Sequence, residues 1–215
     1  ATDLASVVPA LLHYAKFTAG FVVQKRGNHP GKQGGGKCQF MDTVADLLDP
    51  VPTPASPPER LRRLSVAEWE RFQRDGFLVF RQLIPAAVRE QMLAVTLDGV
   101  EREIGPIEYE AELHYPGAPA SLAAEGGRTI RRLKQAQSRH SVFTQWLSDR
   151  ELTDRLADLL GPRVVMPLAH HNCIMTKQPK FSSDTGWHQD IRYWAYQRPD
   201  LISVWISLVP ERVEN

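Results

Sequence analysis

Beyond residue 60, apolar side chains recur first at helical spacing and later at strand spacing. Ser65 and Glu68 have the spacing of a capping box, and the apolar stripe after them ends at Gly76, so we expect a helix of about three turns there. Pro85 suits the first turn of a longer helix that should continue to about Glu103. The pattern therefore predicts two helices early in the folded part of the chain.

Strands and loops are predicted around and after these helices. Residues 77–80 are continuously apolar and should form a buried strand, whereas residues 105–127, rich in Pro, Gly and Ala, should form a long loop over a site. Ser148 with Glu151 repeats the capping box and should begin a third helix that ends at Gly161. Four segments of β-rich composition follow: residues 164–166, 170–176, 187–191 and 201–209. Helices followed by antiparallel strands indicate an α+β or mainly β fold, with a jelly-roll core and helices outside it.

The last of these strands has two different faces. Alternation places Ser203, Trp205 and Ser207 on one side and only aliphatic residues on the other. We expect the first face to line a pocket and the aliphatic face to pack under the helices.

Composition and charge narrow the class of partner. The chain has 215 residues, of which 42% are hydrophobic and 24% charged, as in an ordinary globular domain. Its net charge of +1 argues against a nucleic-acid surface, so we expect a small-molecule partner. Cys38 and Cys173 form neither a C-x-x-C motif nor a disulfide framework, which favours a reducing, cytoplasmic setting. The apolar residues 4–23 are interrupted by a proline, a histidine and a lysine, so no membrane span is expected.

The first 60 residues are expected to lie outside the folded domain. Residues 1–40 carry five Lys or Arg against a single Asp, and predict a basic leader that is disordered or not native; a basic arm that contacts phosphates or lipid head groups is the alternative. Residues 41–60 contain a proline-rich run and predict a stiff linker. The folded domain should therefore cover residues 61–215.

The most informative motif is the tripeptide His188-Gln189-Asp190. On an extended strand, alternate side chains share a face, so His188 and Asp190 would lie side by side while Gln189 faces the other way. An imidazole and a carboxylate are two of the three donors in the facial triad that binds Fe(II). The same tripeptide also occurs on solvated strands, so its neighbourhood has to decide between the two interpretations.

That neighbourhood resembles the metal-binding segment of the phytanoyl-CoA dioxygenase family. The matching residues, in order, are 186–190, Tyr193, Trp194, 198–201 and Trp205. The resemblance covers about residues 65–215 and implies a double-stranded β-helix, a cupin-like jelly-roll core. It also implies Fe(II), dioxygen, and the oxidative decarboxylation of 2-oxoglutarate coupled to hydroxylation of a small or lipid-like organic substrate.

The resemblance assigns the metal ligands. His188 and Asp190 match the first two iron ligands, and Asp190, where related halogenases have a small residue, implies hydroxylation. The family takes its third ligand from a histidine on a later strand, followed by an arginine that pairs with 2-oxoglutarate. No histidine follows His188, and the chain ends at Asn215. We therefore expect residues 61–215 to be an incomplete oxygenase domain, truncated at its C-terminus and inactive alone.

The resemblance also assigns the co-substrate contacts. Lys134 matches a lysine that contacts 2-oxoglutarate, and Trp205 matches an aromatic residue near it. Gln189 lies beside the metal ligands. Cys173 falls at a further co-substrate contact, although the family has another residue type there.

Several alternatives remain open. The chain could be an inactive fragment or a non-catalytic interaction domain that keeps the first half of this fold. Four basic residues could bind an acidic substrate or form a solvated face: Arg131, Arg132, Lys134 and Arg139. Trp69 and Trp146 are expected in the core. Because a partial β-core exposes strand edges, we expect the chain alone to aggregate or to need a partner.

Overall fold

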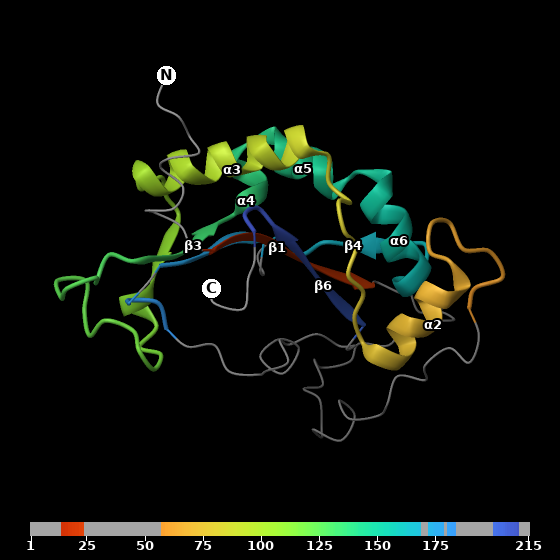
Figure 1. Cartoon of the computed structure of the whole chain (residues 1–215), viewed down its shortest axis with the longest axis horizontal. Coiled ribbons are helices and arrows are strands. Elements are labelled where there is room, and N and C mark those ends of the chain that lie inside the picture. Colours follow the sequence, from red (N-terminus) through yellow and green to blue (C-terminus); the bar gives the residue numbers. More distant parts are fainter. Residues whose placement is uncertain (1–13, 24–56, 169–171, 179, 184–199, 211–215) are drawn as a thin grey trace, which may run out of the picture.

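The computed structural model describes residues 14–23, 57–168, 172–178, 180–183 and 200–210. They form a six-stranded sheet with most of the helices gathered on one side of it (Figure 1). The described helices are α2 (Val66–Asp75), α3 (Ala86–Glu101), α4 (Ala136–Arg139), α5 (Ser141–Leu147) and α6 (Arg150–Leu160), with a short 3-10 helix at Glu110–Glu112. The strands are β1 (Tyr14–Val23), β2 (Ile107–Tyr109), β3 (Ile130–Lys134), β4 (Val164–Val165), β5 (Cys173–Lys177) and β6 (Leu201–Ser207).

The described strands pair in antiparallel fashion throughout. From one edge the order is β2, β3, β5 and β1, and β6 pairs with the opposite side of β1. β4 pairs with Val22 and Val23 of β1, beyond the residues that pair with β5. The result is an α+β arrangement, as expected, in which the first strand of the sequence lies inside the sheet.

The core lies between the helices and one face of the sheet. Met92 of α3 and Phe143 of α5 are fully buried against Leu133 of β3 and Ile174 of β5. Leu133 and Ile174 are directly paired across the sheet, so their side chains lie on the same face. Burying a side chain of this size contributes about 1.5–3 kcal/mol each. This face of the sheet therefore carries much of the stability of the fold.

The helix signals are mostly confirmed. Ser65 and Glu68 form both contacts of the capping box at the start of α2, and Gly76 ends the helix in the left-handed conformation. The cap of α6 differs from the expectation. Asp149 accepts a hydrogen bond from the backbone of Glu151 at 2.7 Å, whereas the Ser148 hydroxyl donates to a backbone carbonyl at the end of α5. Ser148 is therefore the C-cap of α5, and the N-cap of α6 is Asp149, one residue later than predicted.

The prediction of a buried strand at residues 77–80 is wrong. These residues have no regular structure, and Phe77 and Val79 are 63% and 72% exposed. Two strands, β2 and β3, occur where none was predicted. Their alternation is hidden in the sequence because the buried face of β3 includes Arg131, whose charge is paired with glutamates at a distance in the sequence.

The first 60 residues are described only in part. Within the stretch expected to be a disordered leader, Tyr14–Val23 forms β1, and residues 24–56 lie outside the described residues. The expected strand at residues 187–191 also lies outside them. Among the described helices, none has both the length and the apolar character that crossing a membrane would require.

Candidate functional site

Three of the predicted co-substrate residues lie in one row across the sheet. Lys134 at the end of β3 pairs with Cys173 at the start of β5. Cys173 in turn pairs with Thr18 of β1, and Thr18 pairs on its other side with Trp205 of β6. Directly paired residues of an antiparallel sheet point to the same face. Lys134, Cys173 and Trp205 therefore share one face, although they come from three separate segments of the sequence.

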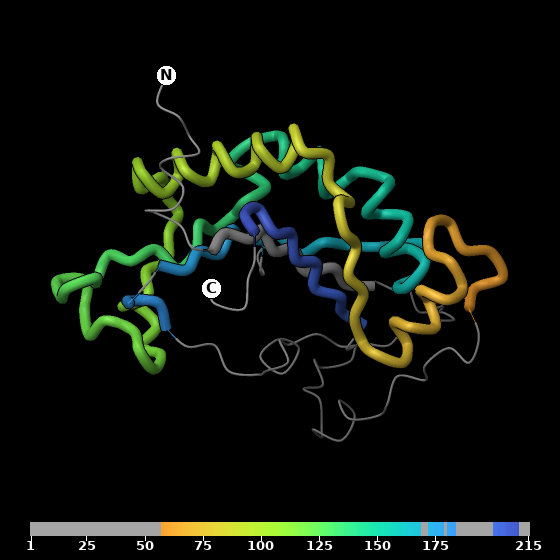
Figure 2. The backbone as a smooth tube through the Cα atoms, in the orientation of Figure 1, coloured from red at the N-terminus to blue at the C-terminus, as the bar shows by residue number. Residues whose placement is uncertain are grey.

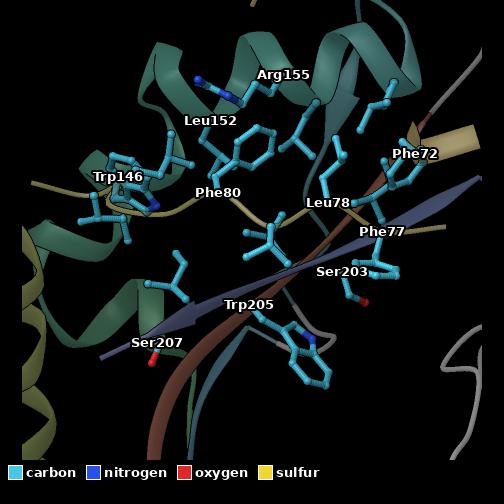
Figure 3. A pocket seen from close by; sticks show the side chains of 18 of the residues that line it. Phe72, Phe77, Leu78, Phe80, Trp146, Leu152, Arg155, Ser203, Trp205 and Ser207 are labelled. Atoms are coloured by element: carbon cyan, nitrogen blue, oxygen red, sulfur yellow. The ribbon is translucent and has the colours of Figure 1, made fainter. Parts of the chain in front are cut away.

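This face is opposite to the hydrophobic core. The residues next to the row, Leu133, Ile174 and Ile206, are all buried beneath the helices. Side chains alternate along each strand, so the row itself points away from the helices. In Figure 3, Trp205 is directed away from the side of β6 on which Phe80 lies. With strands spaced 4.7–4.9 Å apart, the row from β3 to β6 spans roughly 14 Å.

The three residues offer different chemistry. Lys134 is exposed, and backbone hydrogen bonds hold its position: its amide donates to the carbonyl of Pro106 at 3.0 Å, and its carbonyl accepts from Arg139 Nε at 2.9 Å. Cys173 is buried, with 4% of its surface exposed, and Trp205 is 62% exposed. An ammonium group, a small apolar side chain and an indole ring can together receive a small anionic molecule with an apolar middle.

The predicted metal ligands cannot be compared with this row. His188, Gln189 and Asp190 lie outside the described residues. In the part of the chain that the structure describes, no group of three His, Cys, Asp or Glu side chains could hold a metal ion. The donor chemistry of His188 and Asp190 fits Fe(II), and their role stays a prediction.

Two of the basic residues considered as an acidic-substrate site are structural instead. Arg139 donates to the carbonyls of Lys134, Ile104 and Pro106, and burial lowers the pKa of its guanidinium. Arg131 is 5% exposed and is paired inside the protein. These two residues therefore stabilise the edge of the sheet and are not available to bind a substrate.

Arg131 belongs to a buried polar cluster that sequence reasoning missed. Its Nη1 lies 3.1 Å from Glu110 Oε2 and donates to Ser183 Oγ at 2.5 Å, and Ser183 Oγ donates to Glu110 Oε2 at 2.6 Å. Glu110 and Ser183 are fully buried. The cluster connects the 3-10 helix after β2 to Ser183, five residues before His188. No short-range sequence pattern predicts this cluster, because Ser183 and Glu110 are 73 residues apart.

The predicted division of β6 into two faces is confirmed for its aliphatic side. Ile206 is buried, Ile202 and Val204 pack against the core, and Leu208 just beyond the strand is fully buried. Ser203, Trp205 and Ser207 are exposed on the opposite side of the strand. The large cavity beside β6 is lined from both faces of the strand.

Comparison with known proteins identifies the family of the chain. The family model for phytanoyl-CoA dioxygenase (PhyH) matches residues 72–215, which include all of the predicted ligand and co-substrate residues. No curated protein matches the chain, and no solved structure does. The matching family has a cupin-like fold, and its members are generally oxygenases that depend on Fe(II) and 2-oxoglutarate. With the match extending over most of its length, the chain belongs to the phytanoyl-CoA dioxygenase family.

Proposed function

We propose that this chain provides the co-substrate face and two metal ligands of an Fe(II)- and 2-oxoglutarate-dependent hydroxylase acting on a small or lipid-like organic substrate. In the proposed reaction, R–H, dioxygen and 2-oxoglutarate give R–OH, succinate and carbon dioxide, so R–OH and succinate each take one atom of dioxygen and carbon dioxide takes none. The described sheet would then be one half of a double-stranded β-helix.

The observation that carries this proposal is the row of Lys134, Cys173 and Trp205 on one face of the sheet. The family resemblance assigned these residues to the co-substrate one at a time, without knowledge of the strand register. A random assignment to strand residues would put each of them on the core face about as often as on the open one. Their shared face supports the assignment of all three.

Each residue has a role that its environment allows. The exposed ammonium of Lys134 would pair with a carboxylate of 2-oxoglutarate through a charge-assisted hydrogen bond. Trp205 would pack against the apolar carbons of the co-substrate, and Cys173 would form the small surface between Lys134 and Trp205. His188 and Asp190 would hold Fe(II), with Gln189 beside them. Iron bound together with a 2-oxo acid supplies the activation of dioxygen that the reaction needs.

The metal assignment is tested by anaerobic titration of Fe(II) and 2-oxoglutarate into the chain. We expect a saturable visible charge-transfer band that is lost in His188→Ala. A band that persists in His188→Ala would contradict the ligand assignment. If the wild-type chain gives no band, the proposal fails for this chain and the alternative of a non-catalytic domain is favoured.

The co-substrate assignment is tested with Lys134→Met, which keeps the length of the side chain but removes its charge. Losing one charge-assisted hydrogen bond should weaken 2-oxoglutarate binding by about 10- to 100-fold. The matched control is Lys180→Met, an exposed lysine away from the row. Isothermal titration with Mn(II) in place of iron measures both affinities, and equal effects of the two substitutions would overturn the role of Lys134.

A further inference from the structure

The guanidinium of Arg139 joins two segments of backbone at the end of β3. Its Nε donates to the carbonyl of Lys134 at 2.9 Å, its Nη1 to that of Ile104 at 2.9 Å, and its Nη2 to that of Pro106 at 2.7 Å. Lys134 is the last residue of β3, whereas Ile104 and Pro106 belong to the connection between α3 and β2. Figure 2 shows this connection running from the end of α3 to the sheet. One side chain therefore holds both segments, through the planar fork that arginine provides.

The hydrogen bonds around Lys134 form a closed network. The amide of Lys134 donates to the carbonyl of Pro106 at 3.0 Å, and the same carbonyl accepts from Arg139 Nη2. Arg139 Nε in turn donates to the carbonyl of Lys134. Both backbone polar groups of Lys134 are thus bound within one network. Because the lysine side chain starts from this fixed backbone, the network restricts where its ammonium group can lie.

The turn that follows Lys134 is held to the next strand of the row. Gln135 has the left-handed conformation, with a φ of +56° and a ψ of +52°, which is uncommon for a residue with a side chain. Ala136 is fully buried and donates its amide to the carbonyl of Asn172 at 3.1 Å. Asn172 directly precedes Cys173, which pairs with Lys134 across the sheet. A strained residue that is held on both sides indicates a backbone position that the surrounding structure specifies.

Gly99 of α3 leaves space for the guanidinium of Arg139. A Cβ at Gly99 would lie 3.5 Å from Arg139 Nη1 and 3.1 Å from Leu133 Cδ1. An arginine stays charged at neutral pH, and the three described acceptors of Arg139 are uncharged carbonyls. Arg139 can therefore act on an anion near Lys134 in two ways, by fixing the geometry of Lys134 or by its own charge.

We propose that Arg139 is a positioning residue for the co-substrate: it holds the backbone of Lys134 so that the ammonium group meets a carboxylate of 2-oxoglutarate. This inference rests on the role proposed above for Lys134. The geometry favours positioning over charge, because Nε, Nη1 and Nη2 of Arg139 are all directed at backbone carbonyls. Arg139 itself does not contact the co-substrate.

The test separates geometry from charge with Arg139→Lys, which keeps the positive charge but loses the fork. Isothermal titration of 2-oxoglutarate into the chain loaded with Mn(II) measures the affinity. Arg139→Lys should weaken binding by roughly five- to tenfold, a typical coupling between residues of one hydrogen-bond network. The matched control Arg150→Lys, an exposed arginine of α6 that pairs with Asp154, should leave the affinity unchanged. An Arg139→Lys variant that binds as tightly as the wild type would overturn the inference.

A double-mutant cycle shows whether Arg139 acts through Lys134. In a Lys134→Met background, Arg139→Lys should change the affinity no further, because no ammonium group is left to position. Additive effects of the two substitutions would mean that Arg139 acts on 2-oxoglutarate independently, and would also overturn the inference. Circular dichroism shows whether each variant is folded. If Arg139→Lys is not, Arg139→Gln, which also loses the fork, takes its place in the same cycle.

Failure of this inference differs from failure of the proposed function. If Lys134→Met and Lys180→Met bind 2-oxoglutarate equally, the role of Lys134 is wrong, and that of Arg139 is wrong with it. If Lys134→Met weakens binding and Arg139→Lys does not, only the positioning role is overturned.

Discussion

At the residue scale, Glu110, Arg131 and Ser183 form a polar cluster that is buried in the interior. Glu110 is fully buried, and the guanidinium of Arg131 is the cation that compensates its charge. A buried ion pair contributes little compared with an apolar replacement of the whole pair, but removing one partner leaves an uncompensated charge in the interior. The cluster is therefore sensitive to single substitutions.

We expect Arg131→Met to lower the free energy of unfolding by about 3–5 kcal/mol, because Glu110 then stays buried without its cation. Urea denaturation followed by circular dichroism measures the change. Arg128→Met, which removes an exposed pair with Glu103, should have a much smaller effect. Equal effects of the two substitutions would show that Glu110 is not buried as described.

A second residue-scale prediction concerns Glu68 in the capping box. Hydrogen bonds from the backbone and hydroxyl of Ser65 hold the pKa of Glu68 below its ordinary value of 4.5. A lowered folded-state pKa contributes stability above pH 4.5 that is lost as the pH falls through the folded-state value. Glu68→Gln should therefore flatten the fall in stability between about pH 5 and pH 3. Thermal melts across this range test it, and a fall in stability that is just as steep in Glu68→Gln would contradict it.

The single residues of the site were only partly predictable. Resemblance to the family assigned Lys134, Cys173 and Trp205 to the co-substrate, but did not show that these residues share a face. That fact depends on strand register, which is set by pairing between segments far apart in the sequence. Glu110 was missed for the same reason: its partners are 21 and 73 residues away.

At the element scale, elements specified by interactions between nearby residues were predicted better than elements that depend on pairing between distant segments. Helix α2 was predicted from its first turn to its end because its cap and stop signals lie within the helix itself. The strand predicted at residues 77–80 does not form. An apolar run is compatible with a strand, but it becomes one only where a neighbouring strand supplies hydrogen-bond partners. β3 was missed because Arg131 occupies a buried position that looks exposed in the sequence.

The turn before β3 provides an element-scale prediction. Gly126 has a φ of +69°, and a Cβ there would lie 2.2 Å from the ring of Phe181. Gly76 has a similar φ of +78° but open space around it. Both Gly→Ala substitutions introduce backbone strain, and Gly126→Ala adds overpacking of about 1–3 kcal/mol. Chemical denaturation of the two variants isolates this difference, and a Gly76→Ala variant that is destabilised as much as Gly126→Ala would contradict the contact with Phe181.

At the scale of the whole molecule, exposed apolar groups gather near one edge of the sheet. Phe77, Val79 and Trp205 are each more than 60% exposed, and in the described residues β6 pairs with β1 alone. Exposed apolar side chains that gather in one region favour association with another chain. The expectation that the chain alone aggregates or needs a partner stays a prediction.

We therefore expect the chain to self-associate at micromolar concentration and Val79→Lys to shift it toward the monomer, because the charge opposes close approach of a second copy. Size-exclusion chromatography with light scattering measures the distribution. Leu122→Lys, an exposed apolar residue in the loop before β3, should not change it. A wild-type chain that stays monomeric at all concentrations tested would refute the prediction.

The two faces of the sheet have a consequence for how this protein can diversify. Leu133, Ile174 and Ile206 pack under the helices, while their immediate neighbours Lys134, Cys173 and Trp205 point the other way. Substitutions of Lys134 or Trp205, which are both exposed, leave the packing beneath the helices intact and cost little in folding. A one-residue shift of β5 would instead exchange Cys173 for Ile174 and disrupt both faces at once. These strands therefore tolerate point substitution at their exposed positions better than insertion or deletion of a residue.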